Sequence, residues 1–274
     1  MKLAWVTDPH IDHTTEANLR RAMRAGGQVD AAICTGDLSS APRLREHLHQ
    51  LREAFRCPVY FVLGNHDYYG GGFASVRESL HRPQARLTWL RTAPPVELVP
   101  GVVLTGHDGW YDGRAGQPDQ TPVILNDFDK VSDVRTQIYR TGFGYSFADR
   151  PGLLATLRRI SDVWAAEAEA QLRAAMALRP KKIIFATHVP PFPGSCWHEG
   201  QVSNGDWQPW FVNTALGDVL DRVSAEEVGL GIEFEVLCGH THSPGVFQRS
   251  PNLVVRTGGS RYGSPSLAGI FDLG

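Results

Sequence analysis

Several features that would narrow the possible functions are scarce or missing in this sequence. Its 274 residues include only four cysteines, and no two of them form a Cys-x-x-Cys pair, so we expect them to be reduced packing residues. The formal net charge is -2, which leaves no basic excess to neutralise a nucleic-acid backbone or an anionic membrane surface. No apolar run is long enough to span a bilayer. These absences argue against a thiolate metal site, a general nucleic-acid binder and a membrane protein.

The first residues also lack the apolar stretch of a secretory signal peptide. In MKLAWVTDPH an acidic residue and a histidine stand where such a peptide needs its apolar region. We therefore expect a cytoplasmic protein, and the sequence leaves the oligomeric state open.

Short apolar runs alternate with longer stretches of helical spacing, which predicts an α/β fold. With no internal repeat, low-complexity tract or Pro/Gly/Ser linker, we expect a single domain over residues 1–274. The strongest helical pattern covers 152–178, as one helix or two. Two less regular stretches, 106–149 and 190–211, are predicted to lie like lids over a site. The predicted strands are Leu3–Thr7, Ala31–Thr35, Val59–Leu63, Val102–Thr105, Ile183–Thr187, Phe234–Cys238, Leu253–Thr257 and Leu267–Phe271, and the other predicted helices are Glu16–Ala25 and Pro42–Phe55.

Polar side chains follow five of these predicted strands at the point where each strand ends. In an α/β fold the carboxyl ends of neighbouring strands open onto one crevice, so we expect these side chains to meet. Two of the motifs carry ligand-type residues two positions apart, a spacing that sends both side chains to the same side of an extended segment. The five motifs are Asp8-Pro9-His10, Gly36-Asp37, Gly64-Asn65-His66-Asp67, His188 and Gly239-His240-Thr241-His242.

The residue types in these motifs predict a metal site. Carboxylate, imidazole and amide oxygen together suit borderline or hard ions such as Mn, Fe or Zn. Glycines at 36, 64 and 239 would let the backbone turn sharply before each ligand. Any one motif occurs by chance as an ordinary turn, but chance explains the ordered set of five poorly. The predicted ligands are Asp8, His10, Asp37, Asn65, His188, His240 and His242.

In this order the five motifs resemble the signature of the calcineurin-like metallophosphoesterases, over residues 8–242. The resemblance implies a four-layer sandwich of two mixed β-sheets flanked by helices. It also implies a cofactor of two divalent or trivalent transition-metal ions (Mn, Fe or Zn) at the strand ends. The ligand sets that it implies are Asp8, His10 and His242 for one ion, Asn65, His188 and His240 for the other, and Asp37 as a bridge between them.

The resemblance further implies metal-dependent hydrolysis of a phosphate ester without a covalent intermediate. Two ions about 3.5–4 Å apart would hold a bridging hydroxide that attacks phosphorus in line. His66 is then expected to neutralise the developing charge or to protonate the leaving oxygen. Asp67 is a candidate for orienting His66, although adjacent residues on an extended chain point apart.

The second motif departs from that of the Ser/Thr protein phosphatases of this family, which continue it as GDxxDRG. Here the sequence reads Gly36-Asp37-Leu38-Ser39-Ser40-Ala41, so the arginine that binds phosphate in those enzymes is missing. We therefore expect a small-molecule or nucleotide-like phosphoester, with a phosphodiester favoured. A small-molecule phosphomonoesterase and a non-catalytic scaffold relative remain alternatives, although the complete ligand set and His66 favour catalysis.

One further binuclear class shares a single motif with this sequence. Asp8-Pro9-His10-Ile11-Asp12 matches the Asp-x-His-x-Asp of arginase-like amidino hydrolases. Those enzymes lack both the Gly-Asn-His-Asp and the final Gly-His-x-His motifs, so the phosphoesterase interpretation is favoured.

Four residues outside the motifs are candidate substrate contacts. His107 and Trp110 follow a predicted strand, and Trp197 begins an aromatic-rich stretch that could form a wall for a flat group. Arg261 follows two glycines and could hold a phosphate. By contrast, three histidines in polar, helix-like stretches are predicted to be exposed: His47, His49 and His81.

Overall fold

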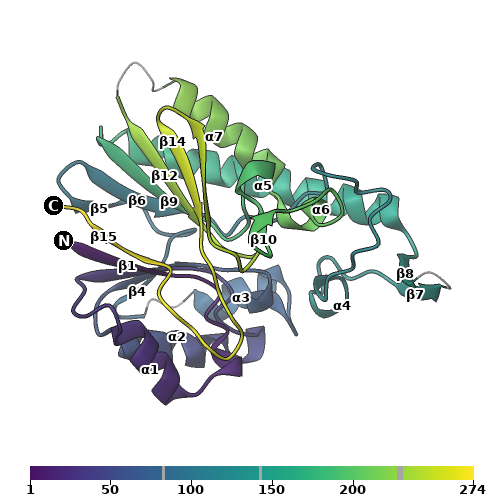
Figure 1. The fold of residues 1–274 in the computed structure, drawn as a ribbon, viewed down its shortest axis with the longest axis horizontal. Coiled ribbons are helices and arrows are strands. Elements are labelled where there is room, and N and C mark those ends of the chain that lie inside the picture. Colours follow the sequence, from purple (N-terminus) through teal and green to yellow (C-terminus); the bar gives the residue numbers. More distant parts are fainter. Residues whose placement is uncertain (82–83, 142–143, 227–230) are drawn as a thin grey trace.

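The computed structural model describes residues 1–81, 84–141, 144–226 and 231–274. Two mixed β-sheets pack face to face, and helices cover the outer face of each sheet (Figure 1). This arrangement confirms the predicted four-layer α/β sandwich.

The first sheet has the strand order β15-β1-β2-β3-β4. Strands β1 to β4 are mutually parallel, and β15 pairs with β1 in the antiparallel direction. Their bounds are Lys2–Val6 for β1, Ala31–Thr35 for β2, Val59–Val62 for β3, Leu87–Trp89 for β4 and Gly269–Asp272 for β15.

The second sheet has the order β13-β14-β12-β9-β6-β5. Its four central strands are parallel, and the two edge strands, β13 and β5, are antiparallel to their neighbours. Their bounds are Val96–Val99 for β5, Val102–Gly106 for β6, Lys182–Ala186 for β9, Glu233–Cys238 for β12, Gly245–Ser250 for β13 and Leu253–Thr257 for β14.

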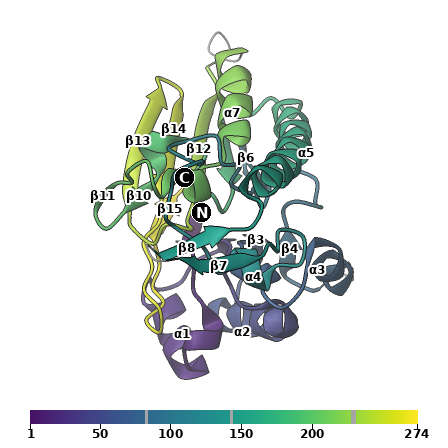
Figure 2. The same cartoon turned by 90° about the vertical axis from the view of Figure 1, so that its right-hand side faces the viewer.

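Helices α1 (Glu16–Arg24), α2 (Leu44–Phe55) and α3 (Phe73–Leu80) cover the first sheet, and α5 (Arg150–Met176) and α7 (Thr214–Glu226) cover the second (Figures 1 and 2). Helix α5 is one continuous helix over most of the stretch 152–178, for which the sequence pattern allowed one helix or two. Its Ser161 does not interrupt it, because the side chain is buried and its hydroxyl donates to Asn213 Oδ1 at 2.8 Å. No described helix is long and apolar enough to cross a membrane.

Side chains alternate between the two faces of each strand, and this alternation separates the layers of the sandwich. On β1, Leu3 and Trp5 pack between the two sheets with Ile184 of β9, whereas Ala4 and Val6 pack toward the helices of the first sheet. Both faces of β1 and β2 are buried, which explains why they appear in the sequence as continuous apolar runs. All four cysteines are buried and free.

The two stretches predicted as lids lie at the end of the sandwich where the parallel strands finish (Figures 1 and 2). Each contains short elements. The first holds α4 (Asp127–Lys130), β7 (Ile138–Thr141) and β8 (Gly144–Phe147), and the second holds β10 (Trp197–His198), β11 (Gln201–Val202) and α6 (Gln208–Phe211). The chain also has four 3₁₀ turns among the described residues, η1 (Ile11–His13), η2 (Ala41–Arg43), η3 (His66–Tyr68) and η4 (Pro193–Ser195).

Candidate metal centre

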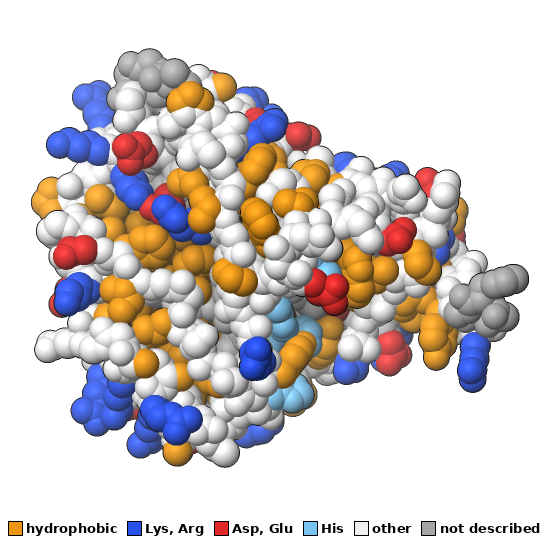
Figure 3. All heavy atoms as spheres, in the orientation of Figure 1, with side chains coloured by type: hydrophobic (Ala, Val, Ile, Leu, Met, Phe, Trp, Pro, Cys, Tyr) orange, Lys and Arg blue, Asp and Glu red, His pale blue; other side chains and the backbone are white. Residues whose placement is uncertain are grey.

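The seven predicted ligands meet where the two sheets end. Three of the five motifs follow β1, β2 and β3 of the first sheet, and two follow β9 and β12 of the second. Figure 3 shows histidine side chains gathered near the middle of this face of the molecule. Six of the ligands are buried, and the side chain of His242 is 25% exposed.

The ligand residues themselves turn the chain after each strand. Nine non-glycine residues in the described part of the chain have positive φ, and five of them are predicted ligands. Residues other than glycine rarely adopt this left-handed backbone conformation, and such backbone strain collects at functional sites. The five are Asp8, His10, Asp37, His240 and His242, with φ between 40° and 71°.

Two of the three glycines before the ligands are needed because they leave room for a neighbouring side chain, and not because the backbone turns there. Only Gly36 has a positive φ, of 96°. A Cβ on Gly64 would collide with the Asp37 carboxylate, and one on Gly239 would collide with Thr7 and Asp8. The prediction of a sharp turn is therefore right for Gly36, and at the other two positions the backbone needs glycine because a ligand carboxylate lies against it.

One group of ligands consists of Asp8, His10 and His242 around one side of Asp37. His10 Nε2 lies 3.1 Å from His242 Nε2, and His242 Nε2 lies 3.3 Å from Asp8 Oδ1. Asp37 Oδ2 is 3.9 Å from His10 Nε2. These four residues can each offer one ligand atom within 4.8 Å of all the others, the spacing of a possible ion site.

A second group consists of Asn65, His188 and His240 on the other side of Asp37. Asn65 Oδ1 lies 3.0 Å from His188 Nε2 and 2.9 Å from His240 Nδ1. Asp37 Oδ1 is 3.4 Å from His188 Nε2. The two carboxylate oxygens of Asp37 therefore face different groups, which suits a residue shared by two ions.

The donor set fits bound cations. Atoms that each bind one ion at about 2.1 Å lie roughly 3.0–3.4 Å from one another, and the short separations in both groups, from 2.9 to 3.4 Å, are close to this spacing. His10 and His242 direct ring nitrogens at each other, and two acidic side chains are buried beside them. A cation among these groups would accept the lone pairs of the ring nitrogens and neutralise the buried carboxylates.

Hydrogen bonds hold the ring nitrogens of the second group in place. His188 Nδ1 lies 2.8 Å from the carbonyl oxygen of Thr35, and His240 Nε2 lies 2.8 Å from that of Trp210. Each carbonyl fixes the proton on its own side of the ring and leaves the other nitrogen free to act as a ligand. Trp210 belongs to α6, so the stretch 190–211 supports the site from outside.

Asp127 fixes the amide of Asn65, a role that the sequence did not reveal. The Asn65 Nδ2 group donates to Asp127 Oδ1 at 2.9 Å, which turns the Asn65 Oδ1 atom toward the two histidines. The hydroxyls of Tyr69 and Tyr111 also donate to this buried carboxylate. In the sequence, Asp127 is only one acidic residue within the stretch 106–149. Most acidic residues in such stretches are solvated, so nothing in the sequence distinguishes this one.

Burial sets the protonation of the ligands. It lowers the pKa of His10 and of His240 to about 3, so both rings are neutral near pH 7 and have a free lone pair. Burial also raises the pKa of Asp37 well above its ordinary value. For Asp8, burial acts in the same direction, but the hydrogen bond to His242 and the charges of the neighbouring histidines together outweigh it and lower the pKa. A bound cation would keep both carboxylates ionised.

His66 lies at the mouth of the site rather than among the ligands. Its backbone N–H donates to Asp37 Oδ1 at 2.8 Å, its ring stacks on Tyr69 at 4.2 Å, and its side chain is 22% exposed. The buried Asp67 does not orient this ring, contrary to the suggestion from the sequence. It accepts bonds from the backbone N–H groups of Ser39 and Gly64, both at 2.8 Å, and so ties together the loops that carry Asp37 and Asn65.

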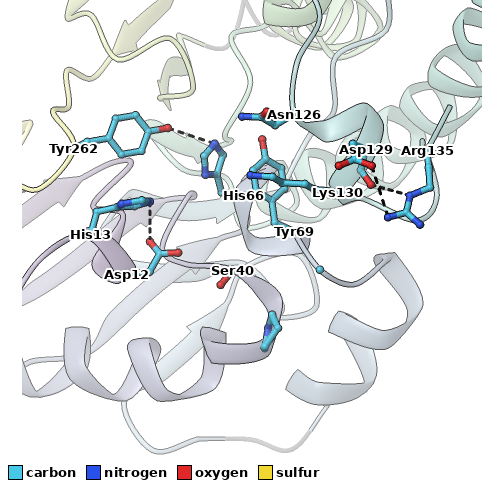
Figure 4. Close-up of a pocket in the computed structure, with 12 residues that line it drawn as sticks. Asp12, His13, Ser40, His66, Tyr69, Asn126, Asp129, Lys130, Arg135 and Tyr262 are labelled. Carbon is cyan, nitrogen blue, oxygen red and sulfur yellow. Dashed lines mark hydrogen bonds and ion pairs between the residues drawn. The ribbon is translucent and has the colours of Figure 1, made fainter. Parts of the chain in front are cut away.

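Two cavities open beside the ligands. One, of about 820 Å³, is lined by residues that include His13, Lys130 and Arg135, and Figure 4 shows it. The other, of about 340 Å³, contains Asp37, the second ligand group except His188, and His242 of the first. The cavities share four lining residues, which are His66, Tyr69, Asn126 and Tyr262.

The predicted substrate contacts are not at these cavities. His107 is buried with its Nε2 atom 3.0 Å from Glu167 Oε2, and Trp110 is buried in an aromatic cluster with Phe73. Both predictions are therefore corrected: the strand before them delivers these side chains into the interior. Trp197 packs against Gly245, Arg261 is exposed, and neither residue lines either of these two cavities.

Other aromatic residues of the stretch 190–211 do reach the smaller cavity. His198, Trp207 and Phe211 line it. The stretch predicted to form an aromatic wall therefore lines this cavity, through residues other than Trp197.

Comparisons with known proteins agree with this geometry. The sequence model of the calcineurin-like phosphoesterases matches residues 1–244. Among solved structures, phosphopantetheinyl hydrolase from Mycobacterium tuberculosis has a TM-score of 0.64 at 16% identity, over 97% of this chain and 95% of the other. A dimetal phosphatase from Danio rerio has a TM-score of 0.53 at 13% identity, over 94% and 87%. No curated protein sequence gives a significant match. The chain belongs to the calcineurin-like phosphoesterase family and is a metal-dependent phosphoester hydrolase.

Proposed function

We propose that the protein hydrolyses a phosphodiester that joins two organic groups of small-molecule or nucleotide-like size. Asp8, His10 and His242 bind one transition-metal ion, Asn65, His188 and His240 bind a second, and Asp37 binds both. Ions bound in this way activate water as the nucleophile and neutralise charge on the phosphoryl group.

The pair of cavities carries the preference for a diester. The two cavities share four lining residues and otherwise have different linings. A phosphomonoester has one organic group and needs one cavity, whereas a phosphodiester has two. The phosphate of a diester would then lie at the shared residues, next to the ligands.

The smaller cavity suits a flat group. The rings of Trp207 and Phe211 stack at 5.0 Å with an interplanar angle of 26°, and His198 lies 4.8 Å from Trp207. Aromatic faces of this kind stack on a base or another planar ring. The larger cavity has polar and charged lining residues, among them Lys130, whose ammonium lies 5.1 Å from the Tyr69 ring.

His66 acts at the leaving oxygen in this proposal. It is one of the four residues at the junction of the cavities, it is partly exposed, and its backbone is bonded to the shared ligand Asp37. From this position its ring can donate a hydrogen bond, and then a proton, to an oxygen that leaves phosphorus.

The test is a comparison of bis-p-nitrophenyl phosphate with p-nitrophenyl phosphate, with Mn, Fe and Zn supplied in turn. We expect a higher kcat/KM for the diester. A preference for the monoester would overturn the diester assignment and favour a small-molecule phosphatase. Absence of hydrolysis of both esters, in protein shown by metal analysis to hold two ions, would instead favour the non-catalytic scaffold.

A further inference from the structure

Tyr262 lies on a segment outside the part of the chain that matches the family. That match ends at residue 244, whereas Tyr262 follows β14 in a turn of the C-terminal segment. This segment returns to the ligands. The backbone N–H of Ser260 donates to the carbonyl oxygen of His242 at 3.1 Å, and the Ser260 hydroxyl donates to the carbonyl oxygen of Asp8. The turn is therefore fixed to two predicted ligand residues.

The ring of Tyr262 covers the first ligand group. It stacks on His10 at 4.2 Å with an interplanar angle of 26°, and its centroid lies 5.1 Å from that of His242. A ring so placed restricts the motion of His10. Even so, the side chain is not enclosed, because 49% of the residue is exposed.

The hydroxyl of Tyr262 points toward the junction of the two cavities. It lies 3.5 Å from His66 Nε2, and Figure 4 shows the two side chains facing each other. Of the two tyrosines at this junction, Tyr69 already donates its hydroxyl to Asp127. The Tyr262 hydroxyl has only the long contact to His66 within the described residues, so it can turn its proton to a bound group.

The junction also lacks a cation that the protein phosphatases of the family use. The sequence after Asp37 has Leu38 to Ala41 and no arginine, and none of the four residues shared by the cavities is Lys or Arg. A phosphate between the cavities would meet no Lys or Arg among these four residues, although Lys130 of the larger cavity lies 5.1 Å from the Tyr69 ring. Tyr262 supplies a hydroxyl at this junction.

We propose that the Tyr262 hydroxyl donates a hydrogen bond to a non-bridging phosphoryl oxygen of the substrate, in place of the missing arginine. The proposal rests on the proposed function for the position of the phosphate. Tyr262 would then be a catalytic residue in contact with substrate, and its ring would separately hold His10.

Two substitutions separate these roles. Tyr262→Phe removes the hydroxyl and keeps the ring over His10, whereas Tyr262→Leu removes both. A hydrogen bond to a charged group is worth about 1.5–3 kcal/mol, so we expect Tyr262→Phe to lower kcat/KM for bis-p-nitrophenyl phosphate by roughly 10- to 150-fold. Its metal content should stay at that of the wild type. Tyr262→Leu should in addition weaken the binding of one ion. Tyr139→Phe, which removes an exposed tyrosine hydroxyl on β7, is the matched control and should change neither property.

A binding measurement makes the test independent of turnover. Inorganic phosphate is titrated into the metal-loaded protein by calorimetry, and we expect weaker binding by Tyr262→Phe than by the wild type and Tyr139→Phe. Equal phosphate affinity and equal kcat/KM in Tyr262→Phe would overturn the role of the hydroxyl. If the wild type binds phosphate but hydrolyses neither nitrophenyl ester, the proposed function fails, and the phosphate titration still decides the role of Tyr262.

Discussion

The two ligand groups are built differently, although they share Asp37. In the group of Asn65, His188 and His240, each side chain has a hydrogen-bond partner on its outer side. In the group of Asp8, His10 and His242, by contrast, His10 Nδ1 is buried without a hydrogen-bond partner among the described residues, and His242 is partly exposed. The group of Asn65, His188 and His240 is therefore held in place before an ion binds. The group of Asp8, His10 and His242 relies more on the ion itself.

Backbone strain follows the same division. Asp8, His10 and His242 all have positive φ, whereas only His240 does so in the other group. Strained conformations persist where the surrounding structure or a ligand compensates for them. The difference predicts unequal affinities for the two ions, and the following experiments test that inequality.

The largest effect is expected for Asp37→Asn, because Asp37 faces both groups. Loss of a supporting residue outside the ligands typically lowers metal affinity by about 10–100-fold, and a shared ligand should cost more than this for each ion. We expect metal analysis to show neither ion retained after dialysis, and hydrolysis to be lost. Asp218→Asn, on an exposed face of α7, is the control. Retention of both ions would contradict the bridging role. Retention of one ion would show that the better-supported group binds without Asp37.

The next largest effect is expected for His66→Ala, which separates chemistry from metal binding. General acid catalysis contributes about 10²–10⁴-fold, so kcat should fall within this range while two ions remain bound. His49→Ala, an exposed histidine on α2, is the control. Full activity in His66→Ala would remove this residue from the mechanism. Loss of an ion would mean that His66 belongs with the ligands instead.

A smaller and more selective effect is expected for Asp127→Ala. It frees the Asn65 amide to rotate, so affinity for the ion of that group should fall by about 10–100-fold while the other ion is little affected. Tyr111→Phe removes a different hydrogen bond to the same carboxylate and serves as the control. Asp127→Asn should restore most of the affinity, because an amide oxygen can still accept from Asn65. Equal weakening of both ions would contradict a specific link between Asp127 and Asn65.

The parts of the molecule predicted from sequence are those where one local pattern decides the outcome. Strand β2 has the predicted bounds, because its apolar run is buried on both faces and ends at polar residues. Strand β14 also has the predicted bounds, although its residues alternate between buried and half-buried. The predicted ligands stood out for a related reason, because each motif directly follows an apolar run. The resemblance to the family then supplied the layers of the sandwich, which strand patterns alone do not specify.

The errors fall where packing between distant segments decides the outcome. His47 was predicted to be exposed on a polar helix, but it is buried and its ring bonds to Ser39. Trp110 was expected near the substrate, but aromatic residues from separate elements enclose it. Arg261 was predicted to hold a phosphate because of its charge, whereas its neighbour Tyr262 lines the larger cavity. The local sequence contains no sign of these contacts.

The smallest expected effect is a difference in the order of metal loss from the wild type. During titration with a chelator, the ion held by Asp8, His10 and His242 should leave first, because its group is strained and partly exposed and His10 Nδ1 has no hydrogen-bond partner among the described residues. We expect roughly a tenfold difference in affinity, the lower end of the effect of supporting residues, measured as a plateau near one ion per chain. In Asp127→Ala the plateau should shrink or disappear, since the other group is then weakened too. Loss of both ions in one step from the wild type would show that coupling through Asp37 outweighs the difference between the groups.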